Sequence, residues 1–265
     1  MGVVNVTPDS FSDGGEWFEP SAAVTHGLVL LEQGADILDI GGESTRPGAS
    51  RPSVKEELRR VLPVVRELTA AGAVVSIDTM RSEVAAAALS AGAALVNDVS
   101  GGLADPAMAS LVADAGTPFV AMHWRGHSAE MQSRAVYDDV VADVSAELVA
   151  RAEALVAQGI APQKIVLDPG FGFAKNAAHN WSLLRQLDRL LGLGFPVLVG
   201  TSRKAFLGRL GVPDGDSPRP PLDRDLATAA TSFHAATVGV WGVRVHHVPS
   251  TLDAMLVAQS LKEGT

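Results

Sequence analysis

Polar side chains that could bind a substrate follow almost every short apolar run of this chain. Asp78, Asn97 and Asp168 present carboxylate and amide edges, which suit a flat heterocycle with several N–H donors and ring acceptors. Arg244 and His246 stand two residues apart, and therefore on one side of a strand, as two expected cationic donors. Such a pair suits an anionic group such as a phosphate. These residue types therefore predict a site for a heterocycle that carries an anion.

A metal ion would fit beside such an anion. Asn5, at the end of the first apolar run, could give an oxygen ligand to Mg²⁺, which typically binds through substrate phosphates and few protein groups. Asn5, Asp78 and Asp168 have no HxH or cysteine partner, so we expect no closed transition-metal site. No Ser-His-Asp order or strong nucleophile is present. Positioning and stabilisation of a leaving group are therefore favoured over covalent catalysis.

The same residues also have a structural interpretation. Asp78, Asn97 or Asp168 could anchor a loop by accepting from backbone amides. Ser202, Arg203 and Lys204 would usually form a solvated loop. The same loops contain further polar residues, namely His123, Arg125 and Lys175. They also contain glycines, which are more often turn residues than ligand-binding ones, at 41, 42, 101, 102, 170 and 172. The other histidines are expected at surface or packing positions, at 26, 127, 179, 234 and 247.

The apolar runs alternate with helical patterns along the whole chain. Strands are expected at residues 3–6, 35–40, 73–78, 93–98, 117–122, 164–168, 195–200 and 241–246. Helices are expected at residues 20–33, 53–71, 81–91, 105–115, 137–158, 179–192, 223–238 and 250–262. Several of these helices stop at a glycine just before the next strand, which is the expected C-cap.

Eight such βα units predict an α/β fold, a single (β/α)₈ TIM barrel that comprises residues 1–265 as one domain. A doubly wound open sheet is the alternative. In a barrel, the loops that follow the strands meet at one face, where active sites are built. The polar residues lie in these loops, whereas the turns on the opposite face are plain Gly-Ala connections.

Composition narrows the class of protein further. The chain has 265 residues, of which 47% are hydrophobic and 19% charged, so it can bury a large core. The 21 basic and 30 acidic residues give a net charge of −9 without a basic stripe, so no nucleic-acid partner is expected. The absence of cysteine excludes disulfides and thiolate chemistry. No leader segment and no membrane-sized apolar stretch is visible, so we expect a cytoplasmic protein.

Seven stretches together resemble the dihydropteroate synthases, the folate-pathway enzymes that sulfonamides target. In chain order they are NVTPDSFSDGG, GGESTRPGA, SIDT, VNDVSGG, DPGFGFAK, SRK and RVHH. The resemblance extends over essentially the whole chain, includes MHWRG after the fifth strand, and has the character of actinobacterial members. It implies a (β/α)₈ barrel, usually homodimeric, with two small-molecule substrates. The enzyme would join 4-aminobenzoate to 6-hydroxymethyl-7,8-dihydropterin diphosphate, releasing pyrophosphate and 7,8-dihydropteroate.

The resemblance also implies a role for individual residues. The pterin ring would be held by Asp78, Asn97, Met122, Asp168 and Lys204. The diphosphate would be contacted by Thr45, Arg244 and His246, and Mg²⁺ by Asn5. The 4-aminobenzoate pocket would be formed by Thr45, Arg46, Pro47, Phe173 and Ser202, under two loops that include Asp9, Phe11 and Ser12. The catalytic groups would be Asp168, Lys204, Arg244 and His246.

These roles suggest a dissociative mechanism. Mg²⁺, Arg244 and His246 would stabilise the departing pyrophosphate, and Asp168 would favour the cationic pterin methylene that develops as the C–O bond breaks. A weakly basic aromatic amine can attack such a cation without an enzyme base. Two features depart from the family: Met1 lies within the first strand, where members usually have several residues before it, and His247 stands where they usually have Asp.

Two other functions remain as alternatives. A corrinoid-linked methyltetrahydrofolate methyltransferase shares a pterin-binding barrel, but would not be expected to contain TPDSFSDGG or Ser-Arg-Lys, which are both present. A catalytically silent pterin-binding paralogue would be expected to lose at least one of Asn5, Arg46, Lys204 and Arg244, and the chain retains all four.

Overall fold

The computed structural model describes residues 1–7, 20–44, 51–126 and 131–263. The strands are β1 (Gly2–Asn5), β2 (Ile37–Gly41), β3 (Val74–Asp78), β4 (Leu95–Asp98), β5 (Phe119–Met122), β6 (Ile165–Asp168), β7 (Leu198–Val199) and β8 (Gly242–Val243). The helices are α1 (Pro20–Glu32), α2 (Val54–Ala70), α3 (Ser82–Ser90), α4 (Met108–Ala115), α5 (Val140–Ala157), α6 (Ala177–Arg185), α7 (Leu187–Leu191), α8 (Asp225–Val238) and α9 (Val248–Glu263). Short 3₁₀ helices are η2 (Met131–Arg134), η3 (Pro162–Lys164), η4 (Ala205–Arg209) and η5 (Pro221–Arg224).

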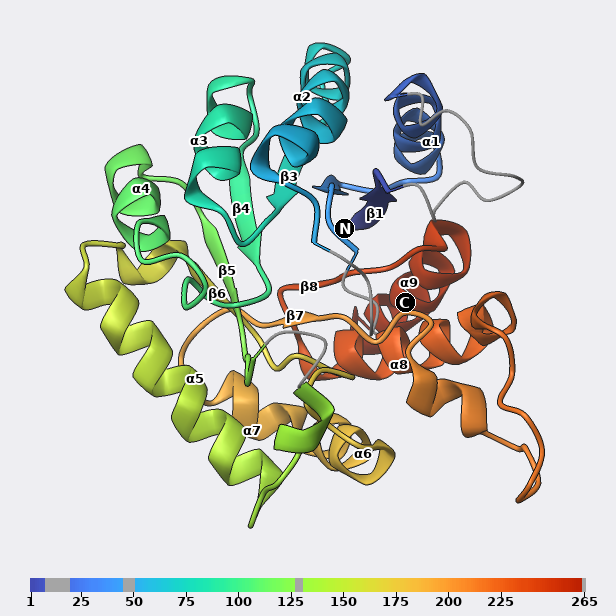
Figure 1. Ribbon diagram of the computed structural model, residues 1–265. Coiled ribbons are helices and arrows are strands. Elements are labelled where there is room, and N and C mark those ends of the chain that lie inside the picture. Colours follow the sequence, from blue (N-terminus) through green and yellow to red (C-terminus); the bar gives the residue numbers. More distant parts are fainter. Residues whose placement is uncertain (8–19, 45–50, 127–130, 264–265) are drawn as a thin grey trace.

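The strands close into a barrel that the helices surround (Figure 1). Strands β1 to β6 pair in parallel and in chain order, as do β7 and β8. Two bridges complete the ring: Leu167 pairs with Val197, and Gly2 pairs with Val245. The predicted (β/α)₈ barrel is therefore confirmed, and the open-sheet alternative is excluded.

Most predicted elements are present with bounds that differ by a few residues. The exception is the single helix expected over residues 179–192, which is two helices, α6 and α7, separated at Gln186. The backbone of Gln186 has φ −121° and ψ 33°, which is not helical. Neither proline nor glycine marks this break in the sequence, so the apolar periodicity alone could not reveal it.

Glycine stops between helix and strand behave as expected. Gly116 caps α4 in the left-handed conformation, with φ 61°, and Gly92 follows α3 with φ 108°. A Cβ at Gly92 would come within 2.5 Å of the Thr69 side chain, so this turn requires glycine for space as well as for conformation.

The hydrophobic core has two parts. The larger part lies between the strands and the surrounding helices and includes Val4, Ile40, Ile77 and Phe119. The smaller part fills the barrel interior with Leu95, Val120, Val166 and Leu198, against which Met1 and Ile37 pack. Burying each such aliphatic side chain contributes roughly 1.5–3 kcal/mol. Within the described residues, no helix is long and apolar enough to cross a membrane.

Candidate active site

Arg244 lies at the centre of a polar network inside the barrel. Its Nε donates to Oδ2 of Asp39 at 2.5 Å, and its Nη2 donates to Oδ2 of Asp78 at 2.7 Å. Asn97 donates from Nδ2 to the same oxygen of Asp39 at 3.0 Å. The network thus ties β2, β3 and β4 to the chain that follows β8. The third nitrogen of the guanidinium, Nη1, makes no hydrogen bond to the described residues, so it remains able to bind an anion.

The electrostatics of this network follow from burial. Burial raises the pKa of Asp78 to about 7, with the neighbouring carboxylate of Asp39 adding to the shift and Arg244 opposing it. Burial disfavours the charged form of Arg244, yet Asp39 and Asp78 raise its pKa above the ordinary value. Arg244 therefore stays a cation in a site that water reaches poorly.

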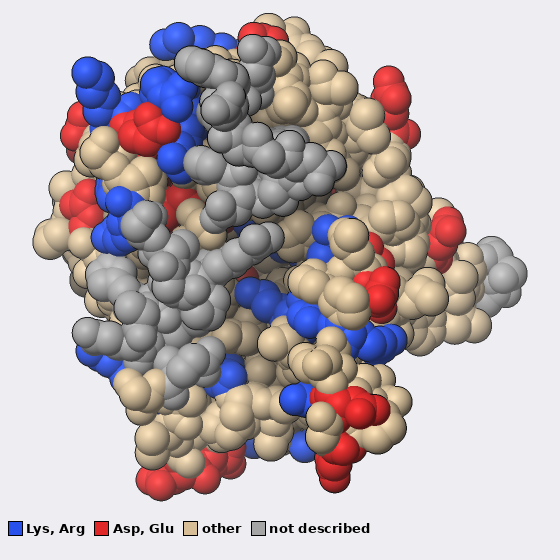
Figure 2. All heavy atoms as spheres, turned by 45° about the vertical axis from the view of Figure 1, so that its right-hand side comes forward, with Lys and Arg blue, Asp and Glu red and all other residues tan. Residues whose placement is uncertain are grey.

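The register of the strands aligns the predicted residues. Neighbouring strands place Asn5 beside Gly41, Gly41 beside Asp78, and Asp78 beside Asn97, in one row across β1 to β4. Met122 and Asp168 are likewise partners on β5 and β6. Strand ends that are far apart in the sequence thus contribute to one interior surface. Figure 2 shows a face of the molecule with a hollow along which Lys and Arg side chains gather.

The loop after β6 brings Asp168, Phe173 and Lys204 together. Asp168 is buried, and its Oδ1 accepts from the amide of Gly170 at 2.7 Å. Burial raises the pKa of Asp168, and the Gly170 amide and the Lys204 cation oppose this rise. The Nζ of Lys204 lies 4.0 Å from the centroid of the Phe173 ring, a cation–π distance. Burial lowers the pKa of Lys204 to about 8.

Ser202 fixes the orientation of His246. The Oγ of Ser202 accepts from the backbone amide of His246 at 3.1 Å and lies 2.9 Å from its Nδ1. The Oγ hydroxyl can donate its own proton to Nδ1, an arrangement that leaves the imidazole proton on Nε2. Burial, together with Arg244, lowers the pKa of His246 to about 3. Burial beside Arg244 therefore favours a neutral imidazole over the second cation that the sequence led us to expect.

The structural interpretations account for some of the polar residues. Asp98 anchors the loop after β4 by accepting from the amides of Ser100 and Gly102, and Asp168 combines such an anchor with a place in the site. The Ser-Arg-Lys segment is not a solvated loop, since Arg203 forms an ion pair with Asp225 at 2.7 Å. The predicted residues that lie outside the described part of the chain are Asp9, Phe11, Ser12, Thr45, Arg46 and Pro47.

Sequence reasoning gave no role to Asp39, although this residue is central to the network. Asp39 is fully buried and pairs with Arg244, and its Oδ1 has no hydrogen-bond partner in the described structure. Strand alternation could have found it, because Asp39 and Gly41 are two residues apart on β2 and share the interior face. An aspartate at an inward position of a buried strand is itself a signal of function.

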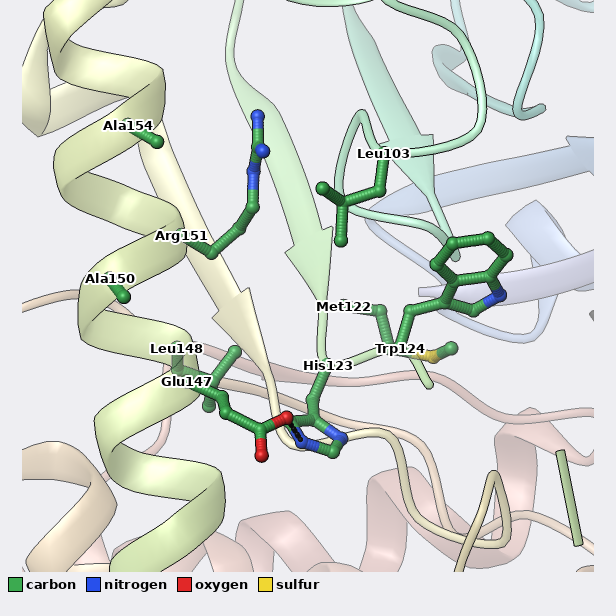
Figure 3. Close-up of a pocket in the computed structure, with 9 residues that line it drawn as sticks. All are labelled: Leu103, Met122, His123, Trp124, Glu147, Leu148, Ala150, Arg151 and Ala154. Carbon is green, nitrogen blue, oxygen red and sulfur yellow. Dashed lines mark hydrogen bonds and ion pairs between the residues drawn. The ribbon is translucent and has the colours of Figure 1, made fainter. Parts of the chain in front are cut away.

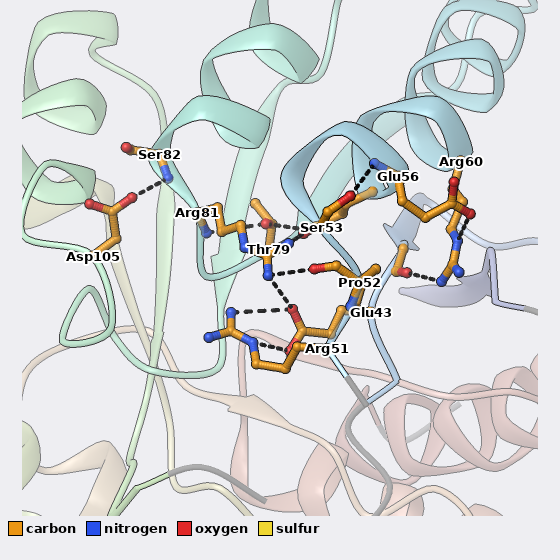
Figure 4. Close-up of polar contacts among 12 residues, drawn as sticks. Glu43, Arg51, Pro52, Ser53, Glu56, Arg60, Thr79, Arg81, Ser82 and Asp105 are labelled. Atoms are coloured by element: carbon orange, nitrogen blue, oxygen red, sulfur yellow. Dashed lines mark hydrogen bonds and ion pairs between the residues drawn. The ribbon is translucent and has the colours of Figure 1, made fainter. Parts of the chain in front are cut away.

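A second polar network fastens β3 to α2 and to the chain around β2 (Figure 4). Glu57 on α2 is buried, and it accepts from the Thr79 hydroxyl at 2.6 Å and from Arg81 Nη1 at 2.5 Å. Nearby, Arg51 donates from Nε to Glu43 at 2.6 Å. Burial raises the pKa of Glu57, whereas its bonds to Thr79 and Arg81 lower it. The network holds these segments in place behind the row of interior residues.

The donor set can be compared with the needs of Mg²⁺. Among the described residues, no group of three His, Cys, Asp or Glu side chains could hold a metal ion by itself. Asn5 offers an amide oxygen at the end of β1, next to the row that includes Asp78. One amide oxygen fits an ion that completes its octahedron with waters and substrate phosphates.

Comparison with known proteins identifies close relatives. Residues 1–246 match the family model described as pterin binding enzyme. The dihydropteroate synthase of Mycobacterium leprae is 55% identical over 258 residues, which are 97% of this chain and 91% of that protein.

Solved structures agree in fold over nearly the whole chain. A dihydropteroate synthase of Xanthomonas albilineans with 4-aminobenzoic acid superposes with a TM-score of 0.90 at 47% identity, over 99% of this chain and 92% of that one. A structure of the enzyme from the same organism in complex with 7,8-dihydropteroate has a TM-score of 0.87 at 44% identity, over 99% and 92%.

Proposed function

The chain belongs to the pterin-binding enzyme family and is a dihydropteroate synthase, and we propose that its reaction takes place at the interior surface around Arg244. The enzyme condenses 6-hydroxymethyl-7,8-dihydropterin diphosphate with 4-aminobenzoate, and it forms 7,8-dihydropteroate and pyrophosphate. The observation that carries the assignment of the site is the convergence of Asp78, Asn97, Asp168 and Arg244 from four strand ends. The corrinoid-linked methyltransferase alternative is set aside, because the relatives compared are dihydropteroate synthases.

The pterin ring would be recognised by groups whose hydrogen-bonding capacity is only partly used. Oδ1 of Asp168 is occupied by the Gly170 amide, which leaves Oδ2 for a ring N–H. Nδ2 of Asn97 is occupied by Asp39, which leaves Oδ1 to accept from a ring amine. Asp78, Met122 and Lys204 would complete the pocket. Met122 would contribute an apolar contact, because its side chain is adaptable and buried.

The diphosphate would be bound at the edge of this pocket. Nη1 of Arg244 and the Nε2–H of His246 are two donors that the described contacts leave unused. Thr45 would add a third contact. Because Asp39 and Asp78 hold the other guanidinium nitrogens, Arg244 would bind the phosphate without first having to be ordered.

Mg²⁺ is the metal that we propose for this reaction, with the side-chain oxygen of Asn5 as its protein ligand. When bound, Mg²⁺ would neutralise charge on the diphosphate oxygens. The 4-aminobenzoate would lie against Phe173, with Arg46 near its carboxylate and with Thr45, Pro47 and Ser202 around it.

We propose that catalysis proceeds by separation of charge rather than by a covalent intermediate. Arg244 and His246 would stabilise the leaving pyrophosphate as the C–O bond breaks. The buried carboxylate of Asp168 would stabilise the positive charge that develops on the pterin, because such charges interact strongly where water is excluded. The amine of 4-aminobenzoate would attack this cation directly. The new C–N bond leaves a proton on the amine nitrogen, which would pass to the departing pyrophosphate or to water, so no enzyme base would be required.

Replacement of Asp168 by Asn tests this mechanism. Asn keeps the shape but removes the negative charge, so we expect kcat to fall by about 100-fold or more while the KM for 4-aminobenzoate changes by less than about threefold. The exposed Asp188→Asn serves as a matched control and should keep full activity. An equal loss in kcat and in 4-aminobenzoate binding for Asp168→Asn would argue against stabilisation of the cation.

We further propose that the enzyme is a homodimer and acts in the cytoplasm. Helix α9 exposes Leu256, Val257 and Leu261, and α8 next to it exposes Leu226. Exposed apolar side chains on two packed helices suit an interface with a second copy. Leu261→Lys should halve the mass measured by light scattering, whereas a wild-type monomer would contradict the dimer.

The cysteine-free sequence suits a reducing compartment, which cell fractionation can check.

A further inference from the structure

Lys175 is a buried cation that has no place in the mechanism above. Lys175 belongs to the loop after β6, and the residue is only 3% exposed. Nζ donates to the carbonyl oxygens of Gly170 at 3.2 Å and Phe173 at 3.1 Å, and to Nδ1 of His123 at 3.0 Å. All three donors of the ammonium group are therefore used, two of them on the backbone of the loop that contains Phe173.

His123 connects Lys175 to α5. Its Nε2 lies 2.9 Å from Oε2 of Glu147, as Figure 3 shows. Because Nδ1 accepts from Lys175, the imidazole proton belongs on Nε2, which donates it to Glu147. Burial and the Lys175 cation lower the pKa of His123 to about 4, so the imidazole is neutral as this arrangement requires. Glu147 is in turn ion-paired with Arg125.

A second contact holds the same loop from the same side. The hydroxyl of Tyr137 donates to the carbonyl oxygen of Ala174 at 3.0 Å. The guanidinium of Arg125 lies 3.9 Å from the centroid of the Tyr137 ring. Arg125 thus contacts both Tyr137 and Glu147. Residues 170–174 are therefore held through their backbone carbonyls by a connected set of polar and aromatic groups.

The cost of burying this cation indicates that it does more than fill space. Burial lowers the pKa of Lys175 to about 7, against the opposing charge of Asp168. An uncompensated buried ion is strongly destabilising, and an apolar side chain of similar volume often stabilises a protein as well or better. A methionine would occupy the same volume without this cost, but it could not bond to two carbonyl oxygens.

The loop that Lys175 holds places two groups of the proposed site. The amide of Gly170 donates to Asp168, and Phe173 lies beneath the ammonium group of Lys204. The loop also contains close approaches: a Cβ at Gly170 would come within 2.6 Å of the His123 carbonyl oxygen, and one at Gly172 within 3.0 Å of Lys204. Small displacements of the backbone would therefore move Asp168, Phe173 and Lys204 relative to one another.

We propose that Lys175, oriented by the His123–Glu147 pair, is a positioning residue that keeps Asp168 and Phe173 aligned with Lys204 for both substrates. The inference rests on the proposed function of these three residues. It assigns to Lys175 a role in the geometry of the reaction and no contact with substrate. Lys175 acts on the reaction through the backbone of residues 170–173, and its charge also favours the ionised form of the Asp168 carboxyl group.

Lys175→Met tests the proposal against a purely structural role. A misplacement of about 1 Å can cost on the order of 100-fold in rate, so we expect kcat/KM to fall by about that factor, with a raised KM for both substrates. The urea midpoint should change little, because removal of the buried charge offsets the loss of the three hydrogen bonds that Nζ makes. Lys175→Arg, which keeps a charge and several donors, should recover part of the loss.

Lys262→Met is the matched control. Lys262 also donates to a backbone carbonyl, that of Ala236 at 2.7 Å, but it is exposed on α9. Its variant should show wild-type kinetics. Lys175→Met with wild-type KM values, or with a loss of kcat alone that parallels a loss of folded protein, would overturn the proposal. A wild-type enzyme that makes no dihydropteroate in the same assay would instead overturn the proposed function.

Discussion

On two strands of the barrel, an apolar inward-facing residue is followed two positions later by a polar one. On β4, Leu95 belongs to the apolar interior cluster, whereas Asn97 belongs to the Arg244 network. On β6, Val166 belongs to the cluster, whereas Asp168 belongs to the site. Both layers are buried and are built by the same backbone, so the fold does not dictate their chemistry. The apolar layer, which is the interior cluster, stabilises the fold. The polar layer, which is the Arg244 network with Asp168, lowers the stability of the fold and provides the groups for binding and catalysis.

The polar layer has an identifiable cost. Asp39 is fully buried, the side chains of Asp78 and Arg244 are only 13% and 22% exposed, and Oδ1 of Asp39 has no hydrogen-bond partner in the described part of the structure. Each unsatisfied buried polar atom costs about 1–3 kcal/mol, and buried ions cost more. The charge network is therefore retained for what it does to a ligand. The predictions below test this difference between the two layers.

Removal of Arg244 should have the largest effect. Arg244→Met leaves Asp39 and Asp78 buried without a cation, so the free energy of unfolding at pH 8 should fall by about 3–5 kcal/mol, and activity should be lost. The loss should be smaller at pH 5, because the carboxyl group of Asp78, whose pKa is raised to about 7, becomes protonated and needs no counter-ion. Urea unfolding at both pH values measures this.

Arg59→Met is the control for that experiment. Arg59 forms an ion pair with Glu56 on the surface of α2, with 57% of its side chain exposed, and its removal should cost less than about 1 kcal/mol. If both arginine variants lost equal stability, the distinction between the buried network and a surface ion pair would be wrong.

In the apolar layer, Leu198→Ala should reduce stability without changing substrate binding. Leu198 is fully buried in the interior cluster, so the cavity should cost about 2–5 kcal/mol in the free energy of unfolding. The KM values of the folded fraction should stay at the wild-type level. Leu222→Ala, at a site 68% exposed, should change stability by less than about 0.5 kcal/mol. A raised KM for Leu198→Ala would mean that the two layers are not independent.

In the polar layer, the titration of Lys204 should have a smaller effect, which is seen in the pH dependence of kcat/KM. Its pKa is lowered to about 8, so the cation that we assign to pterin binding should be lost as pH rises through this value. We expect kcat/KM to fall by about tenfold per pH unit above it. Lys204→Arg keeps its charge and should move this alkaline limb beyond pH 10, although the different shape lowers activity at pH 7. If the alkaline limb of the Lys204→Arg profile stayed at the wild-type pH, the titration would belong to another group.

Sequence reasoning predicted the barrel because the period of the apolar residues reflects local structure. It predicted Asp78, Asn97 and Asp168 as neighbours because parallel strands end at one face. It could not predict the neutral state of His246, which depends on burial beside Arg244, nor the break at Gln186. The contacts of Lys175 were also out of reach, because His123 is 52 residues away in the chain. Pairings between distant residues and desolvation arise only in the folded protein.

The most direct test of the account is pyrophosphate release by the purified protein, given the dihydropterin diphosphate and Mg²⁺, with and without 4-aminobenzoate. The account predicts release that depends on 4-aminobenzoate and matches the dihydropteroate formed. Tight binding of the pterin without any release would contradict it and would indicate a pterin-binding paralogue that has lost catalysis.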